Sequence, residues 1–135
     1  MADPIVPVSW GELLDKVAIL EIKRQRLRAP AALANTEREL TALAPALAAL
    51  VREPLGLGLG LGLAELRSAL AAVNQRLWTI EDRIREKEAQ GDFGEAFVAL
   101  ARSVYRENDE RGRIKRAINT LLGSGLMEEK QYAAY

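Results

Sequence analysis

The sequence predicts an all-α fold, in which an antiparallel helical hairpin packs with two further helices as a small elongated bundle. Three observations support this prediction. Apolar residues recur every three or four positions along most of the chain, as in helices that bury one face. From Leu63 to Ile84 these spacings alternate without a break, giving the coiled-coil-like seam of a helix packed lengthwise against another. Only a Leu-Gly run at 55–62 alternates like a strand, and glycine at every second position weakens a strand.

The composition limits the chemistry that this chain can perform. Its 135 residues are the length of one domain. It has no cysteine and no histidine, which excludes disulfides, thiolate nucleophiles, zinc fingers and histidine-based triads, and we expect neither a metal nor a cofactor. Its 19 basic and 19 acidic residues balance, which argues against a dedicated nucleic-acid binder. No signal peptide and no apolar run long enough to span a bilayer is evident, so we expect a cytoplasmic protein.

The first helix is expected over residues 9–28. Ser9 and Glu12 have the spacing of a capping box, in which the serine oxygen accepts an amide proton of the first turn. Pro30 should end the helix, because the residue before a proline is disfavoured in the helical region. The buried side is marked by apolar residues at helical spacing: Leu13, Val17, Leu20 and Leu27.

The second helix is expected over residues 36–52, where Thr36 and Glu39 form another capping box. Pro45 removes an internal hydrogen bond, so this helix should bend or begin again there. The Leu-Gly run is then interpreted as a flexible connector at 54–62. Its glycines lack the spacing of a dinucleotide-binding loop, and no Gly-Lys-Ser/Thr of a P-loop follows them.

Two long helices are expected next, at about 63–89 and 93–122. The short turn between them forces an antiparallel hairpin. Asp92 is the expected cap of the last helix, and Gly123 is a suitable residue to end it. Residues 123–135 form a tail.

Polar residues interrupt the faces on which apolar residues are expected. One polar stripe lies beside the leucine seam of the third helix, and another lies on the fourth helix. These stripes are interpreted either as a solvated edge, where ion pairs are ordinary, or as a partly buried pocket between helices. Converging polar groups in an apolar seam cost stability unless they are paired, which favours a function for them. The candidate ligand-binding residues of that pocket are Glu21, Asn74, Trp78, Glu81, Arg85, Tyr105, Asn108, Arg111 and Lys115.

The residue types suggest roles within such a pocket. Its arginines and its lysine are expected to bind an anion, and Glu81 is the candidate catalytic residue, as an acid, a base or an orienting carboxylate. Arg111 is the clearest case, since it lies almost at the centre of the apolar arc of its helix. Trp78 could stack on a ligand, although tryptophan more often anchors a core or an interface. The basic stretch at 23–28 could contact phosphate, although cations are ordinary at the C-terminal end of a helix.

Four stretches carry a family resemblance: SWGELLDKVAILEIKRQRL, VNQRLWTIEDRIREKE, FVALARSVYRENDERGRIKRAIN and EEKQYAAY. Together they resemble a family of small bacterial all-helical proteins classed as a domain of unknown function. That family often occurs near genes for surface polysaccharide synthesis and has no established activity to carry over. The resemblance implies that the polar residues of these stretches are the ones to test, among them Glu12, Asp15, Asp82, Lys130 and Tyr132.

Two classes of function fit these features. We favour a helical module that forms a homodimer and binds a protein partner, in surface polysaccharide metabolism if the resemblance holds, because heptad seams most often mean packing. The alternative is a small all-helical enzyme or a binder of an anionic metabolite, such as a sugar phosphate or nucleotide sugar. Nucleic-acid contact through 23–28 is a third and weaker hypothesis. Convergence of Glu81, Arg85, Arg111 and Lys115 on one reachable cavity would favour the alternative.

Overall fold

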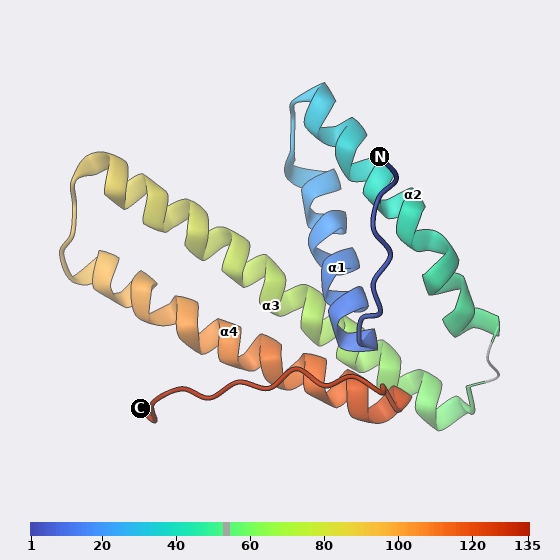
Figure 1. Cartoon of the computed structure of the whole chain (residues 1–135). Helices are drawn as coiled ribbons and strands as arrows, with labels where there is room; N and C mark the ends of the chain where they lie inside the picture. The colour runs from blue at the N-terminus through green and yellow to red at the C-terminus, as the bar shows by residue number, and fades with distance from the viewer. Residues whose placement is uncertain (53–54) are drawn as a thin grey trace.

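The computed structural model describes residues 1–52 and 55–135, and this part of the chain contains four α-helices and no strand. The all-α prediction is therefore confirmed. α3 and α4 form a long antiparallel hairpin, and α1 and α2 form a shorter one that stands across one end of it (Figure 1). The helices are α1 (Trp10–Arg26), α2 (Pro30–Arg52), α3 (Leu57–Gln90) and α4 (Glu95–Leu122).

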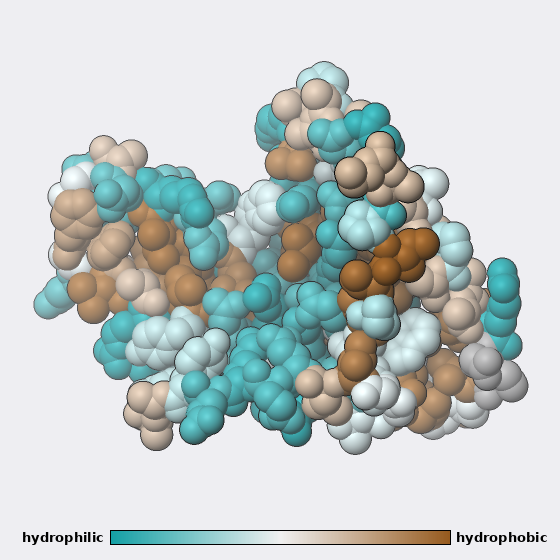
Figure 2. Space-filling view, viewed as in Figure 1, coloured by the Kyte–Doolittle hydropathy of each residue, from teal (hydrophilic) through white to brown (hydrophobic). Residues whose placement is uncertain are grey.

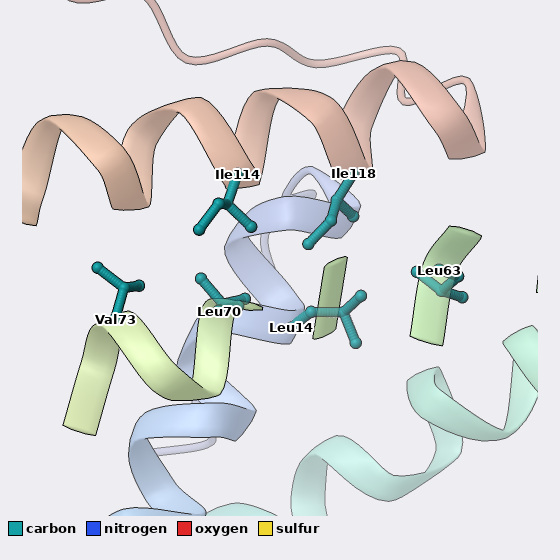
Figure 3. Packing of buried hydrophobic residues seen from close by; sticks show 6 residues of the cluster. All are labelled: Leu14, Leu63, Leu70, Val73, Ile114 and Ile118. Atoms are coloured by element: carbon teal, nitrogen blue, oxygen red, sulfur yellow. The ribbon is translucent and has the colours of Figure 1, made fainter. Parts of the chain in front are cut away.

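The core lies where α1 crosses the α3–α4 hairpin. Val73 on α3 and Ile118 on α4 are both 0% exposed there. Burying one such side chain stabilises a fold by about 1.5–3 kcal/mol, so this crossing is the main source of stability. Apolar side chains of three helices meet in it, as Figure 3 shows: Leu14, Leu63, Leu70, Val73, Ile114 and Ile118.

α1 begins as the sequence predicts. Ser9 is its N-cap, and the Ser9 hydroxyl oxygen accepts a hydrogen bond from the Glu12 amide at 3.2 Å. The helix ends at Arg26, two residues before the expected end at residue 28, because Leu27 already has an extended backbone. The N-terminal cap of α1 thus matches the prediction, whereas its C-terminal end comes earlier than predicted.

α2 begins six residues earlier than expected, at Pro30. Proline is well suited to a first helical position, since the amide hydrogen that it lacks has no partner there. Thr36, the expected cap, lies inside the helix and donates its hydroxyl proton to the Ala32 carbonyl at 3.0 Å. The helix also continues through Pro45 without a new start. Pro45 is exposed, so the carbonyl that loses its helical partner can face water.

The connector prediction was wrong for most of the Leu-Gly run, because α3 begins at Leu57 rather than at residue 63. Leucine is a strong helix former, and Leu59 lies one turn before Leu63, so it extends the buried seam. The alternation separates the leucines into two sets: Leu59 is half-buried, whereas Leu57 and Leu61 are 82% and 58% exposed. Residues 53–54 lie outside the described residues, and with them the first residue of the connector expected at 54–62.

The turn between α3 and α4 uses glycine twice. Gly91 ends α3 with a left-handed backbone (φ 66°), which favours glycine over residues with a side chain. Gly94, not Asp92, is the N-cap of α4, so this helix begins at Glu95 instead of residue 93. The Asp92 carboxylate instead accepts the Gly94 amide at 3.2 Å, within the turn itself.

Gly123 ends α4 as expected, again with a left-handed backbone (φ 64°). The tail that follows runs back along α4 as an extended segment (Figure 1). Within residues 1–52 and 55–135, no helix has both the length and the hydropathy that a membrane crossing needs.

Candidate functional site

A groove opens between α1 and the α3–α4 hairpin, next to the core crossing. Its volume is about 540 Å³. Most of its wall comes from α3, which presents four polar or aromatic positions at spacings of four, three and four that share one helix face. We call this surface the polar groove, and it is lined by Ile19, Asn74, Leu77, Trp78, Glu81, Asp82, Arg85, Asn108 and Arg111.

The polar groove unites six of the nine predicted site residues: Asn74, Trp78, Glu81, Arg85, Asn108 and Arg111. The hairpin register explains this. In this register the Arg76 guanidinium on α3 pairs with the Glu107 carboxylate on α4 at 2.9 Å, and Asn74 lies opposite Arg111. Convergence of four charged residues on one cavity was expected to favour a metabolite-binding function. Three of the four, Glu81, Arg85 and Arg111, line this groove.

Arg111 is the free cation of this groove. It is half-buried, and its Nη1 donates one long hydrogen bond of 3.4 Å to the Asn74 side-chain oxygen. No carboxylate among the residues that the structure describes lies within ion-pair distance of it. A guanidinium has five N–H donors, so most of the binding capacity of Arg111 is unused. Arg85, by contrast, is ion-paired with Glu81 one turn away on the same helix.

A buried polar network lies behind the groove. The Asp15 carboxylate of α1 is 5% exposed and accepts a hydrogen bond from the Asn74 amide nitrogen at 2.8 Å. That bond fixes the orientation of the Asn74 amide, whose oxygen is thereby turned to Arg111. The ammonium of Lys115 lies 3.6 Å from the other oxygen of Asp15. Arg111 is thus positioned by a chain of buried polar groups that reaches from α4 through α3 and α1 and back to α4.

Lys115 belongs to this network and not to the groove, contrary to its predicted place among the anion-binding residues. It is 8% exposed, and its ammonium contacts carboxylates of Glu12 at 2.8 Å, Asp15 at 3.6 Å and Glu128 at 3.3 Å. Burial by itself lowers the pKa of Lys115, but the hydrogen bond to Glu12 and the charge of Asp15 raise that pKa above its ordinary value. The lysine therefore connects α1, α4 and the tail as a structural cation.

A second contact between α1 and α4 could not be recognised in the sequence. The Gly11 amide donates to the Asn119 side-chain oxygen at 2.6 Å, and the Trp10 amide donates to the Ser124 hydroxyl oxygen at 3.0 Å. The backbones approach so closely that a Cβ on Gly11 would lie 2.5 Å from the Lys115 carbonyl oxygen. The one sign of this close approach in the sequence is Gly11 itself, a glycine in the first turn of an otherwise well-formed helix.

The two remaining predicted site residues lie elsewhere. Glu21 is half-buried beside Arg67 on the other side of α1, and Tyr105 faces the C-terminal tail. Asp82 lines the groove although it was marked only by the family resemblance.

The basic stretch at 23–28 makes contacts within the protein. The Arg24 guanidinium lies 3.9 Å from the Glu37 carboxylate of α2, and Arg26 donates to the Gln75 side-chain oxygen of α3 at 2.8 Å. These side chains are exposed, and exposed pairs of this kind contribute little to stability.

The polar groove is the feature of this protein that bears most directly on its function. In the described ranges, no group of three or more Asp or Glu side chains is arranged to hold a metal ion. The groove can instead offer one unpaired guanidinium, two carboxylates, two amides and an indole ring. No family model, no curated protein and no solved structure matches this chain.

Proposed function

We propose that the protein binds a small phosphorylated sugar in the polar groove. The observation that carries this proposal is the convergence of Glu81, Arg85 and Arg111 on one reachable cavity beside Trp78. Charges scattered over a solvated edge would not share a cavity with a half-buried indole. The groove therefore favours binding of an anionic metabolite over a helical module whose polar stripes are only a solvated edge.

Arg111 is the group that would hold the anionic end of the ligand. A planar guanidinium matches the oxygens of a phosphate with two parallel hydrogen bonds, which gives both strength and orientation. Its partial burial strengthens such a bond, because the effective dielectric constant is lower there than in water. The buried contact with Asp15 orients the Asn74 side-chain oxygen that accepts from Arg111, and it does so before the ligand arrives.

The rest of the groove suits the sugar. Trp78 is half-buried and offers a flat ring, while Glu81 and Asp82 offer acceptors and Asn108 both a donor and an acceptor for hydroxyl groups. Glu81 is held by Arg85, which suits a carboxylate that orients a hydroxyl. The resemblance to a family encoded near surface polysaccharide genes makes sugar phosphates the first ligands to test.

Arg111→Leu is expected to weaken binding of glucose 1-phosphate at least about tenfold, since it removes a charge-assisted hydrogen bond worth about 1.5–3 kcal/mol. The variant should be as stable as the wild type or more stable, because leucine suits the apolar arc of α4 and no buried ion pair is broken. Isothermal titration calorimetry measures the affinity, and urea unfolding measures the stability.

The matched control is Arg106→Leu, which removes an exposed arginine of the same helix outside the groove and should leave the affinity unchanged. If no sugar phosphate in a thermal-shift panel stabilises the wild-type protein, the proposal fails. It also fails if Arg111→Leu gains stability and still binds the ligand as the wild type does.

The free end of the α3–α4 hairpin supports a second candidate, a homodimer. This end extends beyond α1 (Figure 1), and hydrophobic atoms line the surface between the two helices there (Figure 2). Phe93 and Val98 are 55% and 50% exposed. Residues 81–88 carry four acidic and three basic side chains, whereas 95–106 carry one acidic and two basic. A second copy related by two-fold symmetry would set α3 against α4 and bring opposite charges together.

Light scattering tests the homodimer directly. The dimer has twice the chain mass of 14.9 kDa, and Val98→Glu is expected to convert it to the monomer by placing a charge in the apolar contact. Val51→Glu, at a more exposed valine on α2, is the control and should leave the mass unchanged. A wild-type protein that stays monomeric at high concentration would exclude this candidate.

A further inference from the structure

The C-terminal tail is held against α4 by polar contacts along its length. It follows the helix back from Gly123 towards the middle of the hairpin (Figure 1). An extended segment with no helical hydrogen bonds stays in one place only if its side chains are bound. The polar contacts that bind it include the ion pairs of Lys115 with Glu128 and of Arg116 with Glu129, and the Tyr135 hydroxyl, which donates to Asp109.

A second cavity of about 630 Å³ lies between the tail and α4. Three tyrosines line it: Tyr105 from the helix, and Tyr132 and Tyr135 from the tail. The rings of Tyr105 and Tyr135 meet edge to face, with centroids 5.0 Å apart. We call this space the tail cavity. Its aromatic lining is unlike that of the polar groove and suits a flat apolar ring.

The two cavities share part of their lining. Asn108 and Arg111 line both the polar groove and the tail cavity. A phosphate on Arg111 therefore lies at a junction from which a ligand can extend in two directions. Lys130 provides a second cation on the tail side, and its one ion pair among the described residues, to Glu128, is long at 3.9 Å.

We propose that the ligand is a nucleoside diphosphate joined to a sugar, with its sugar in the polar groove and its base in the tail cavity. The inference rests on the function proposed for the groove. Two cations, Arg111 and Lys130, match two phosphates. The tyrosines provide faces on which a base stacks, an interaction that does not depend strongly on which base is present.

Calorimetry with three probes, UDP-glucose, UDP and glucose 1-phosphate, tests this assignment on the full chain. UDP-glucose is expected to bind at least about tenfold more tightly than glucose 1-phosphate, because the base adds a stacking contact. Tyr132→Ala should weaken binding of UDP-glucose and UDP at least about fivefold, because it removes the stacking contact, and should leave glucose 1-phosphate binding unchanged. Tyr132→Phe keeps the ring and should bind as the wild type does. Tyr132 is 75% exposed, so neither change should affect folding.

The outcomes separate this inference from the function on which it rests. If glucose 1-phosphate binds and UDP-glucose binds no more tightly, the nucleoside assignment is wrong and the groove proposal stands. If Tyr132→Ala weakens all three probes equally, the tail closes over the ligand without contacting a base, which also overturns the assignment. If UDP binds as tightly as UDP-glucose and glucose 1-phosphate does not bind, the sugar site in the groove is refuted.

Discussion

Replacing Gly11 with alanine is expected to destabilise the fold by about 3 kcal/mol, as severe overpacking does when backbone atoms must move. The added Cβ would lie 2.5 Å from the Lys115 carbonyl oxygen and 2.9 Å from the Asn119 side-chain oxygen. Neither can yield easily, because one belongs to the backbone of α4 and the other accepts the Gly11 amide at 2.6 Å. α1 would have to move away from α4, which would weaken the apolar core beside it.

The matched control is Gly60→Ala, another helical glycine, with no atom within 4 Å of its would-be Cβ. Alanine there is expected to stabilise the protein by about 0.5–1 kcal/mol, because it restricts the unfolded chain at no cost in packing. Urea unfolding followed by circular dichroism measures both variants. Equal effects of the two substitutions would show that α1 does not pack against α4 as closely as the structure has it.

Lys115→Met is expected to cost about 3 kcal/mol, the lower end of the range for removing one partner of a buried ion pair. Methionine matches lysine in length, so lost packing contributes little. Glu12 and Glu128, with side chains 50% and 48% exposed, can be hydrated when the ammonium is gone. Asp15 cannot, since its side chain is 7% exposed, and its carboxylate would remain buried without a counter-charge.

A double-mutant cycle distinguishes this electrostatic cost from a general loss of packing. Asp15→Asn keeps the shape of the side chain and its ability to accept the Asn74 amide hydrogen, but removes the charge. The double variant Asp15→Asn/Lys115→Met is therefore expected to recover at least half of the stability that Lys115→Met loses. A double variant whose losses simply add would show that the two charges do not interact.

The hairpin and its polar stripe could be predicted because they depend on local spacing. The seam from Leu63 to Ile84 identified α3, and a short turn with glycine leaves only an antiparallel return for α4. Counting turns in both directions from Gly91 places Asn74 opposite Asn108, which lines the same groove, whereas the contact between Asn74 and Arg111 came from the structure. Residues that share a helix face, or lie on facing turns of a hairpin, come together by helical geometry alone.

The starts of α2 and α3 were predicted wrongly because the residues there are compatible with more than one local structure. Pro30 was interpreted as a helix end, yet proline is equally suited to the first turn of the next helix. The Leu-Gly run was interpreted as a connector because alternating glycine weakens a strand and the glycine spacing of a phosphate-binding loop is absent. Its leucines nevertheless supply helix propensity, and burial of Leu59 next to Leu63 favours extending α3 over leaving these residues in a loop.

The roles of Arg111 and Lys115 show where sequence reasoning reaches its limit. The two cations lie four residues apart on one helix, and both interrupt an apolar pattern. Only the position at which α1 crosses the hairpin separates them: Asp15 and Glu12 meet Lys115, while Arg111 stays beyond the crossing and faces the groove.

The sequence by itself thus determined the helices of the hairpin, their direction and the polar stripes along them, since these follow from periodicity and turn length. The tertiary structure alone decided which of those polar residues are buried in pairs and which line a cavity. Helix crossings depend on close contacts between distant segments, such as Gly11 against the Lys115 carbonyl, and no local pattern records these.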